Sequence, residues 1–315
     1  MDEQAAMQQY YLATAVAAAR AAGKLALEAA HQPRTITYKG PKDIVTEVDV
    51  ACEKVIIEII HTRHPDHNIL SEEAGRVAAP QVGDNDYTWI IDPIDGTNNY
   101  AAQLPFWCIS VALARGKQPI VAAVYDPTHE ELYTAVAGEG AFLNGQPLRV
   151  NQPSELHVAL IACDTGSAEE FSRRSLNVTS QLRPHVHRVR ILGSAVLAIS
   201  YVAAGRLDLF YHLNLHPWDV AAALLLVREA GGRGTTFNGQ DCNVFDRELV
   251  AANPSLLAAF LNIPHMEEVA HQSLGFRLQP LSVASSGQAA ALLLRFVRDK
   301  ERSKIVYSAA PAYVL

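Results

Sequence analysis

Cysteine, long apolar runs and positive charge are scarce in this sequence, and each scarcity excludes a class of protein. The chain of 315 residues has four widely spaced cysteines: Cys52, Cys108, Cys163 and Cys242. Because they form no C-x-x-C pair, they predict free, reduced thiols rather than a disulfide framework. The longest apolar runs are Val220–Val227 and Ala289–Leu294, far short of the roughly 20 residues that a membrane-spanning helix needs. We therefore expect no membrane-spanning segment.

Lysine and arginine are outnumbered by acidic residues. The formal net charge is −7, from 26 basic and 33 acidic residues. Proteins that bind nucleic acid or an anionic membrane non-specifically need a basic face, so neither is an expected partner. The N-terminal residues Met1–Gln4 lack the basic start and apolar core of a signal peptide. A cytoplasmic location is the expectation.

The apolar residues are numerous, and their spacing predicts an α/β (α+β) protein. They make up 49% of the chain, which is enough for a full core. Helical periodicity predicts helices over 8–31, 50–64, 168–183, 194–204 and 219–230. Short or alternating apolar runs predict strands over 35–38, 68–70, 88–91, 109–115, 120–125, 131–136, 158–163, 189–192 and 207–212. Turns are expected at 39–42 and 138–145.

The order of these elements predicts two parts and an extension. Consecutive strands dominate residues 1–150, an α+β part that carries most candidate metal ligands. Strands and helices alternate in residues 151–263, an α/β part that supplies Asp219 and substrate contacts. Residues 264–315 form an extension to which no function is assigned. Its expected elements are a connector (265–275), a strand (276–284), a helix (288–302) and a last strand (305–307).

Four segments present acidic residues at a strand end or a helix start: 43–49, 71–75, 89–97 and 216–219. In the third, a short apolar strand leads into Asp92, Pro93, Ile94 and Asp95. Because proline restricts the turn, both carboxylates and the Ile94 carbonyl can face one point. Oxygen ligands of this kind suit Mg²⁺. The following Gly96–Thr97 can start a short helix whose free amide groups suit an anion.

Each acidic residue alone has a simpler explanation. A single aspartate after a strand is usually a turn former. The pair Glu72–Glu73 alone is usually solvated, and Asp219 alone is an ordinary helix cap. Their joint occurrence in apolar surroundings favours a shared site.

These motifs resemble those of the inositol monophosphatase family. The matching segments are Asp43-x-Val-Thr-x-x-Asp49, Glu72-Glu73, Asp92-Pro-Ile-Asp-Gly-Thr97, and Trp218-Asp219 with the helix end Glu229-Ala-Gly-Gly232. The resemblance covers about residues 8–262. It implies a layered α-β-α-β-α sandwich of the inositol monophosphatase and fructose-1,6-bisphosphatase type, and a homodimer. It also implies lithium-sensitive hydrolysis of a small phosphate monoester with Mg²⁺, for which Mn²⁺ can substitute.

The resemblance also implies the ligands of two or three ions. One ion would be held by Glu72, Asp92 and the Ile94 carbonyl. A second would be held by Asp92, Asp95 and Asp219. A third would bind near Glu72, largely through water.

The remaining roles carried over concern the water and the phosphate. Asp49 and Thr97, together with Glu72, would orient and deprotonate the nucleophilic water. Asp95 and the amides of Gly96 and Thr97 would hold the phosphate. Because no cysteine or histidine is placed as a nucleophile, attack by metal-activated water is the simpler reaction.

The family alignment places substrate contacts at Ser167, Gly193, Ser194, Ala195 and His212. His212 stands where inositol-preferring animal enzymes carry a glutamate, and an imidazole offers different donors. The alternative is a strand-end histidine that faces solvent. Inositol-1-phosphate is the first expected substrate, followed by fructose 1,6-bisphosphate and other sugar or histidinol phosphates.

Three other interpretations stay open. A catalytically silent regulatory binding protein could retain the fold, although every core position is chemically intact. A two-metal nuclease would need a basic groove, which the charge of −7 does not suggest. The segment Lys39–Lys42 is either a solvated turn or a loop that closes over the metals.

Overall fold

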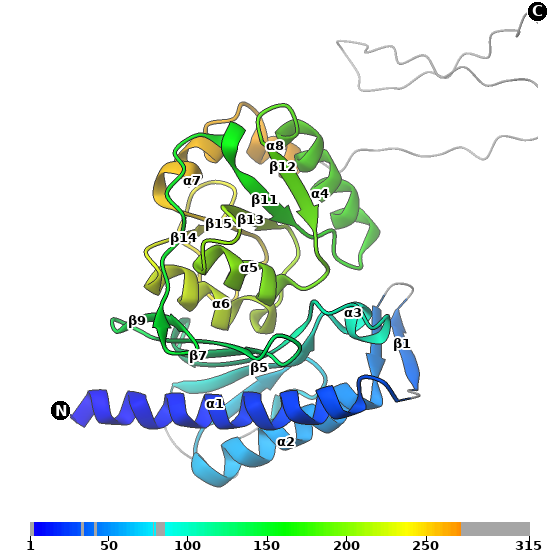
Figure 1. Ribbon diagram of the computed structural model, residues 1–315, viewed down its shortest axis with the longest axis vertical. Helices are drawn as coiled ribbons and strands as arrows, with labels where there is room; N and C mark the ends of the chain where they lie inside the picture. The colour runs from blue at the N-terminus through cyan, green and yellow to red at the C-terminus, as the bar shows by residue number, and fades with distance from the viewer. Residues whose placement is uncertain (1–2, 33–34, 41–42, 78, 80–85, 272–315) are drawn as a thin grey trace, which may run out of the picture. The chain divides into compact units, whose positions relative to one another are not determined.

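Two β-sheets and the helices around them organise the chain (Figure 1). The computed structural model describes residues 3–32, 35–40, 43–77, 79 and 86–271. The helices are α1 (Glu3–Ala29), α2 (Glu47–Arg63), α3 (Thr97–Ala101), α4 (Glu169–Leu182), α5 (Ala195–Ala203), α6 (Pro217–Glu229), α7 (Pro254–Leu261) and α8 (Met266–His271). A short 3₁₀ helix covers Leu156–Val158.

The strands form sheets of eight, five and two members. Those of the first half are β1 (Ile36–Gly40), β2 (Asp43–Thr46), β3 (Asn68–Ser71), β4 (Gly75–Val77), β5 (Tyr87–Asp95), β6 (Cys108–Arg115), β7 (Gln118–Asp126), β8 (Glu131–Val136), β9 (Gly140–Leu143) and β10 (Gln146–Pro147). Those of the second half are β11 (Leu160–Cys163), β12 (Arg188–Ile191), β13 (Leu209–His212), β14 (Arg233–Thr235) and β15 (Leu249–Ala252). The strand orders are β10-β9-β8-β7-β6-β5-β3-β4, β12-β11-β13-β15-β14, and β1-β2.

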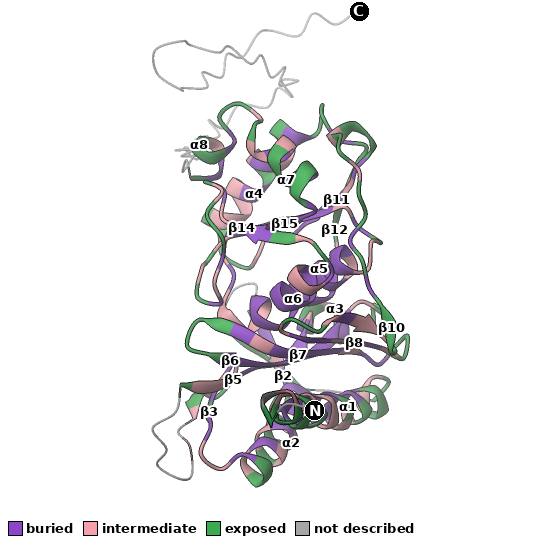
Figure 2. Ribbon diagram, turned by 90° about the vertical axis from the view of Figure 1, so that its left-hand side faces the viewer, coloured by how far each residue is buried: buried purple, intermediate pink, exposed green. Residues whose placement is uncertain are grey.

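The elements stack in five layers, as the predicted α-β-α-β-α sandwich requires. Helices α1 and α2 cover one face of the eight-stranded sheet, and α5 and α6 lie between the two large sheets (Figures 1 and 2). Helices α4, α7 and α8 cover the outer face of the five-stranded sheet. The middle helices are buried over most of their length, because both of their faces contact a sheet.

Most predicted elements are confirmed, with two kinds of difference. The strands β2, β4, β9, β10, β14 and β15 and helix α7 were not predicted, and β9 lies in a segment expected to be a turn. The connector expected over 265–275 is wrong as far as it is described, since Met266–His271 is helical. Helix α7 begins at Pro254 with the Asn253 side chain capping Leu256 N, an Asn-Pro pair that otherwise indicates a turn. The elements predicted over 276–307 lie outside the described residues.

The proposed division near residue 150 stays a prediction. The eight-stranded sheet ends at Pro147 and the five-stranded sheet begins at Leu160, but Met1–Leu274 form one compact unit. Among the described residues, no helix has the length and apolar character to span a membrane. All four cysteines are buried and free, as predicted.

A buried pair of histidines lies where α1, the end of α2 and β5 meet. His64 and His67 are 4% and 3% exposed, and their rings stack with centroids 5.0 Å apart. The Thr14 hydroxyl lies 2.9 Å from His64 Nε2. Trp89 Nε1 donates to His67 Nδ1 at 3.1 Å. This bond requires Nδ1 to be unprotonated, so the fold holds His67 in its neutral form.

We expect the free energy of unfolding to fall as the pH drops below about 6.5. Burial lowers the pKa of His64 to about 4, and burial also lowers the pKa of His67. The unfolded chain therefore binds more protons than the folded chain from pH 6.5 down to about 4. Above pH 6.5 the two histidines do not lower the free energy of unfolding. Below pH 6.5 each histidine lowers it by up to about 1.4 kcal/mol per pH unit.

Urea denaturation at a series of pH values tests this expectation. His64→Gln should flatten the decline between pH 6.5 and 4.5, because it removes one of the two groups. His187→Gln, a substitution of an exposed histidine, should leave the decline as in the wild type. Equal slopes for His64→Gln and the wild type would contradict the assignment.

Candidate active site

A bulge at the end of β5 brings two aspartates to the same face of the sheet. Asp92 pairs with Ser110 of β6 and Asp95 pairs with Cys108, with a register shift between them. Three residue steps on β5 thus oppose two on β6, which is the count of a β-bulge. Without the extra residue, positions 92 and 95 would point to opposite faces. Ser110 and Cys108 are two apart and share a face, so their partners do as well.

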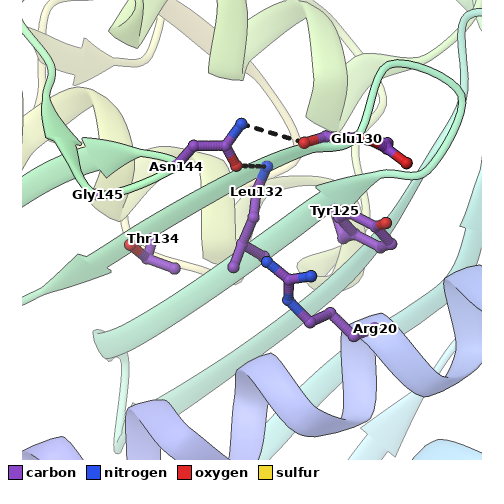
Figure 3. Close-up of a pocket in the computed structure, with 7 residues that line it drawn as sticks. All are labelled: Arg20, Tyr125, Glu130, Leu132, Thr134, Asn144 and Gly145. Atoms are coloured by element: carbon purple, nitrogen blue, oxygen red, sulfur yellow. Dashed lines mark hydrogen bonds between the residues drawn. The ribbon is translucent and has the colours of Figure 1, made fainter.

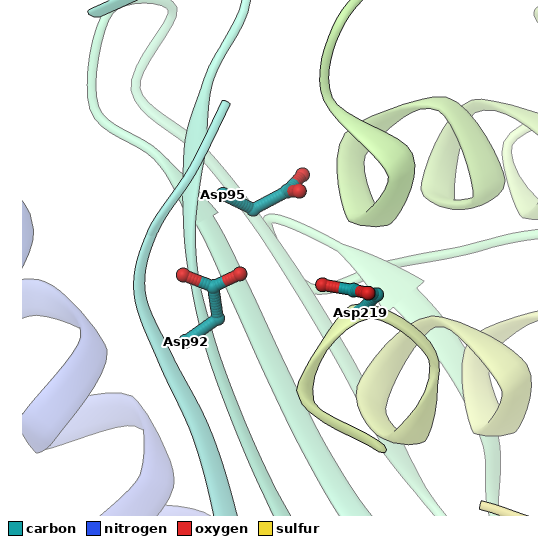
Figure 4. Close-up of side chains that lie close together, drawn as sticks. All are labelled: Asp92, Asp95 and Asp219. Atoms are coloured by element: carbon teal, nitrogen blue, oxygen red, sulfur yellow. The ribbon is translucent and has the colours of Figure 1, made fainter. Parts of the chain in front are cut away.

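A third aspartate approaches this face from another layer. Asp219 lies in the first turn of α6, and its carboxylate accepts a hydrogen bond from His216 N at 2.7 Å. Figure 4 shows the carboxylates of Asp92, Asp95 and Asp219 directed toward one another. One oxygen of each lies within 4.8 Å of the other two. The predicted convergence of these three residues is therefore present in the fold.

The electrostatics of this group fit a divalent cation. Burial, followed by the charges of Glu72, Asp95 and Asp219, raises the pKa of Asp92 well above its usual value. Burial also raises the pKa of Asp219. Crowded carboxylates of this kind repel one another unless a cation neutralises them. All the donors are hard oxygen atoms, which Mg²⁺ prefers over nitrogen or sulfur.

Asp95 is held by the start of α5. Val196 N donates to its Oδ2 at 2.9 Å, Ala195 N donates to its Oδ1 at 3.2 Å, and the Ser194 hydroxyl donates to Oδ2. Burial raises the pKa of Asp95, whereas the hydrogen bonds from Ser194 and Val196 lower it. Ser194 and Ala195 were predicted to contact the substrate. In the fold they orient Asp95, and Ser194 is only 2% exposed.

The predicted pair Asp49 and Thr97 is in contact beside these aspartates. Thr97 Oγ1 lies 3.1 Å from Asp49 Oδ1 and 3.0 Å from Ile94 O. The other oxygen of Asp49 accepts from Thr46 N at 2.9 Å, within the capping box of α2. Asp49 is fully buried, and burial raises its pKa. A carboxylate and a hydroxyl are thus fixed against each other at the edge of the carboxylate group.

Glu72 lies next to this group but outside its closest set. Its charge raises the pKa of Asp92, and its Oε1 is 2.9 Å from Lys39 Nζ. Lys39 Nζ also lies 2.8 Å from Glu73 Oε1. Lys39 lies in β1 rather than in a turn, and closure of the segment 39–42 over the metals stays a prediction. Lys42 lies outside the described residues.

Gly96 and Gly193 allow two loops to approach closely. Gly96 has a φ of +93°, and a Cβ there would lie 3.1 Å from Gly193 O. Gly193 has a φ of +79°, and its Cβ would lie 3.0 Å from the Asn99 side chain. Asn99 Nδ2 donates to Leu192 O at 2.7 Å, and Gly193 N donates to Asp164 Oδ2 at 2.9 Å. The predicted substrate segment at 193–195 therefore abuts the predicted phosphate-binding residues.

The other two predicted substrate residues differ in their surroundings. His212 ends β13 and is 6% exposed, so the solvent-facing alternative is wrong. Its Nδ1 accepts from Asn214 N at 3.0 Å. A Cβ on Gly166 would lie 3.5 Å from its Cε1, which places His212 against the loop that follows β11. Ser167 is exposed in that loop.

Sequence reasoning missed three residues that hold loops of the site. Asn99 and Asp164 bind residues 192 and 193, and Glu53 accepts hydrogen bonds from Glu73 N and Ala74 N beside Glu72. Asn99 follows the Gly-Thr motif by two positions, and Asp164 directly follows a predicted strand. Both positions could have been flagged as turn formers. Glu53 lies inside a predicted helix, where a glutamate gives no signal of its own.

A surface pocket of about 500 Å³ lies apart from this site, against α1 and strands β7 to β9 (Figure 3). None of the predicted site residues lines it. Its lining consists of Arg20, Tyr125, Glu130, Leu132, Thr134, Asn144 and Gly145. The candidate active site therefore rests on the converging side chains, not on this pocket.

Comparisons with known proteins agree with this geometry. Residues 7–269 match the inositol monophosphatase family. Inositol monophosphatase 1 of Solanum lycopersicum is 36% identical over 265 residues, covering 82% of this chain and 96% of that protein. The chain belongs to the inositol monophosphatase family.

Two further relatives strengthen the family assignment. Nus factor SuhB of Escherichia coli (strain K12) is 40% identical over 252 residues, covering 78% of this chain and 92% of that protein. The crystal structure of extragenic suppressor protein suhB from Bartonella henselae aligns with a TM-score of 0.76 at 31% identity, covering 80% of this chain and 97% of that one. As an inositol monophosphatase family member, the protein is a phosphatase of the phosphoric monoester hydrolase class. The family depends on metal, typically Mg²⁺, and the acidic group fits that requirement.

Proposed function

We propose that the protein hydrolyses a small phosphorylated polyol at a Mg²⁺ site, with inositol-1-phosphate as the first candidate. The residues proposed to hold the ions are Glu72, Asp92, Ile94 through its carbonyl, Asp95 and Asp219. The observation that carries this proposal is the convergence of three of these carboxylates from β5 and α6. The relative named inositol monophosphatase 1 supports the choice of substrate.

The chain's own groups have distinct tasks in this reaction. When bound, Mg²⁺ supplies positive charge to the phosphate and lowers the pKa of a water from about 15.7 to about 7. The Thr97 hydroxyl has one proton, and while it donates to Asp49 its lone pair can accept a hydrogen bond from that water. Asp49, whose pKa is raised by burial, is the proposed final acceptor of the proton. Asp95 and the amides of Gly96 and Thr97 are the proposed phosphate contacts.

His212 bears on the choice of substrate. Burial lowers its pKa to about 4, so the ring is neutral near pH 7. Because Nδ1 accepts from Asn214 N, the ring proton lies on Nε2, which is a donor. A glutamate at this position could only accept. Fructose 1,6-bisphosphate, other sugar phosphates and histidinol phosphate therefore remain the second candidates.

Several finer properties are part of the proposal. We propose two or three Mg²⁺ ions, with Mn²⁺ able to replace them, inhibition by Li⁺, and a homodimer. A cytoplasmic location stays a prediction from the sequence. A catalytically silent regulatory role is the second alternative. Among the described residues of the proposed core, none has lost the side chain that the reaction would need.

A substrate panel tests the proposed function. We expect phosphate release from inositol-1-phosphate with Mg²⁺ and none with EDTA, because the carboxylates cannot supply the cation's charge. The panel should include fructose 1,6-bisphosphate, histidinol phosphate and p-nitrophenyl phosphate, compared by kcat/KM. No release from any of them with Mg²⁺ would favour the silent alternative. Equal release in EDTA would exclude the metal mechanism.

A further inference from the structure

Glu53 is a buried carboxylate that the proposed reaction does not use. It lies in α2 and is 6% exposed. Its Oε1 accepts three hydrogen bonds, from Ser71 Oγ, from Glu73 N at 3.1 Å and from Ala74 N at 3.0 Å. Ser71 is the last residue of β3, and Glu73 and Ala74 lie in the turn that leads to β4. A single side-chain oxygen of one helix therefore fixes this turn.

The residue between these donors is Glu72, a proposed metal ligand. Ser71 precedes it and Glu73 follows it, and both are bound to the same oxygen of Glu53. The backbone on either side of Glu72 is thus tied to α2. A metal ligand needs this kind of support, because the affinity of a site for its metal ion depends on ligands that are oriented by further hydrogen bonds.

Glu53 also shares a helix face with Asp49. The two residues are four positions apart, which is about one helical turn. Asp49 holds Thr97, and Glu53 holds the turn that carries Glu72. One face of α2 therefore sets where Asp49 and Thr97, the proposed proton-accepting residues, lie relative to Glu72, the proposed metal ligand.

Stability alone gives a poor reason for a carboxylate here. The same turn already carries the carboxylates of Glu72 and Glu73. A further negative charge in this buried acidic region is unfavourable.

We propose that Glu53, with Ser71, is a positioning residue that holds Glu72 in the orientation needed to bind Mg²⁺. This inference rests on the metal site of the proposed function. The Ser71 hydroxyl adds a side-chain donor to this support.

Glu53→Ala tests the proposal by titration calorimetry with MgCl₂ on the full chain. We expect Mg²⁺ affinity to fall by about 10- to 100-fold, the usual effect of removing such support. The kcat at saturating Mg²⁺ should stay within about threefold of the wild type, because Glu53 touches no reacting atom. Glu53→Gln keeps an oxygen acceptor and should restore affinity to within about fivefold.

Glu229→Ala is the matched control. Glu229 is also a helix carboxylate that accepts two turn amides, from Gly138 N and Gly140 N, each at 2.9 Å. Its loss should lower the melting temperature without changing Mg²⁺ affinity. A Glu53→Ala protein with the same pattern, a lower melting temperature and wild-type Mg²⁺ affinity, would overturn the inference.

Two further outcomes keep the test decisive. If Glu53→Ala does not fold, Ser71→Ala serves instead, because it removes only one donor. It should lower the affinity for Mg²⁺ by about two- to fivefold. Unchanged affinity would count against the inference. A wild-type protein that binds no Mg²⁺ would overturn the proposed metal site and this inference with it. Wild-type binding that Glu53→Ala retains would overturn the inference alone.

Discussion

Asp92→Asn is expected to abolish hydrolysis and yet to make the protein more stable in EDTA. Asp92 is 1% exposed and central to the acidic group. Asparagine keeps the shape and can still accept the hydrogen bond from Ile94 N, which is 3.0 Å long. It removes one of several charges that repel one another, so the free energy of unfolding should rise by about 0.5–2 kcal/mol. Loss of the shared ligand should lower kcat/KM by at least about 10³-fold.

Thermal unfolding with and without Mg²⁺ measures both effects on the same samples. Wild-type protein should gain about 2.7 kcal/mol at a free Mg²⁺ concentration of 100 times the Kd, and Asp92→Asn should lose most of that gain. Asp126→Asn is the control, because Asp126 is fully buried, accepts from Thr128 N and His129 N, and lies outside the proposed ligands. It should lose stability and keep the response to Mg²⁺. Near-normal turnover of Asp92→Asn would refute the site.

The contrast between these two aspartates shows which parts of the site the sequence could predict. The Asp92-Pro-Ile-Asp motif is local, and the bulge that aligns its two carboxylates follows from spacing and a proline. The family resemblance then supplied the roles of Asp219 and Thr97 and the five-layer order of the fold. Asp126 has the same burial but caps a turn, and nothing in its neighbourhood in the sequence separates the two roles.

Contacts between distant segments could not be predicted in the same way. Ser194 reaches Asp95 across 99 positions, Lys39 reaches Glu72 across 33, and Ser71 reaches Glu53 across 18. Each pairing depends on how layers and loops meet, which local propensity does not determine. For this reason the hydrogen bond from Ser194 to Asp95 was not predicted, and the substrate contact expected at Ser194 stays a prediction.

Asp49→Asn and Thr97→Val are each expected to lower kcat by about 10²- to 10⁴-fold, the usual contribution of a positioned general base. Asparagine keeps an oxygen for Thr46 N, and valine keeps the shape of threonine, so the fold and Mg²⁺ affinity should change little. Thr97 Oγ1 lies 3.1 Å from Asp49 Oδ1, and the two groups act on one proton. The double variant should therefore be no worse than the poorer single variant.

Single-turnover kinetics at saturating Mg²⁺ measures the chemical step in these variants. Thr97→Ser keeps the hydroxyl and should retain most of the rate, which separates the loss of the hydroxyl from the loss of packing. Independent losses that multiply in the double variant would show that the two groups do not act as a unit. If Mg²⁺ affinity falls together with the rate, Asp49 binds the metal ion and is not the proton acceptor. We expect Asp49→Asn to lose less hydrolytic activity than Asp92→Asn, because Asp92 is the ligand proposed to be shared by two ions.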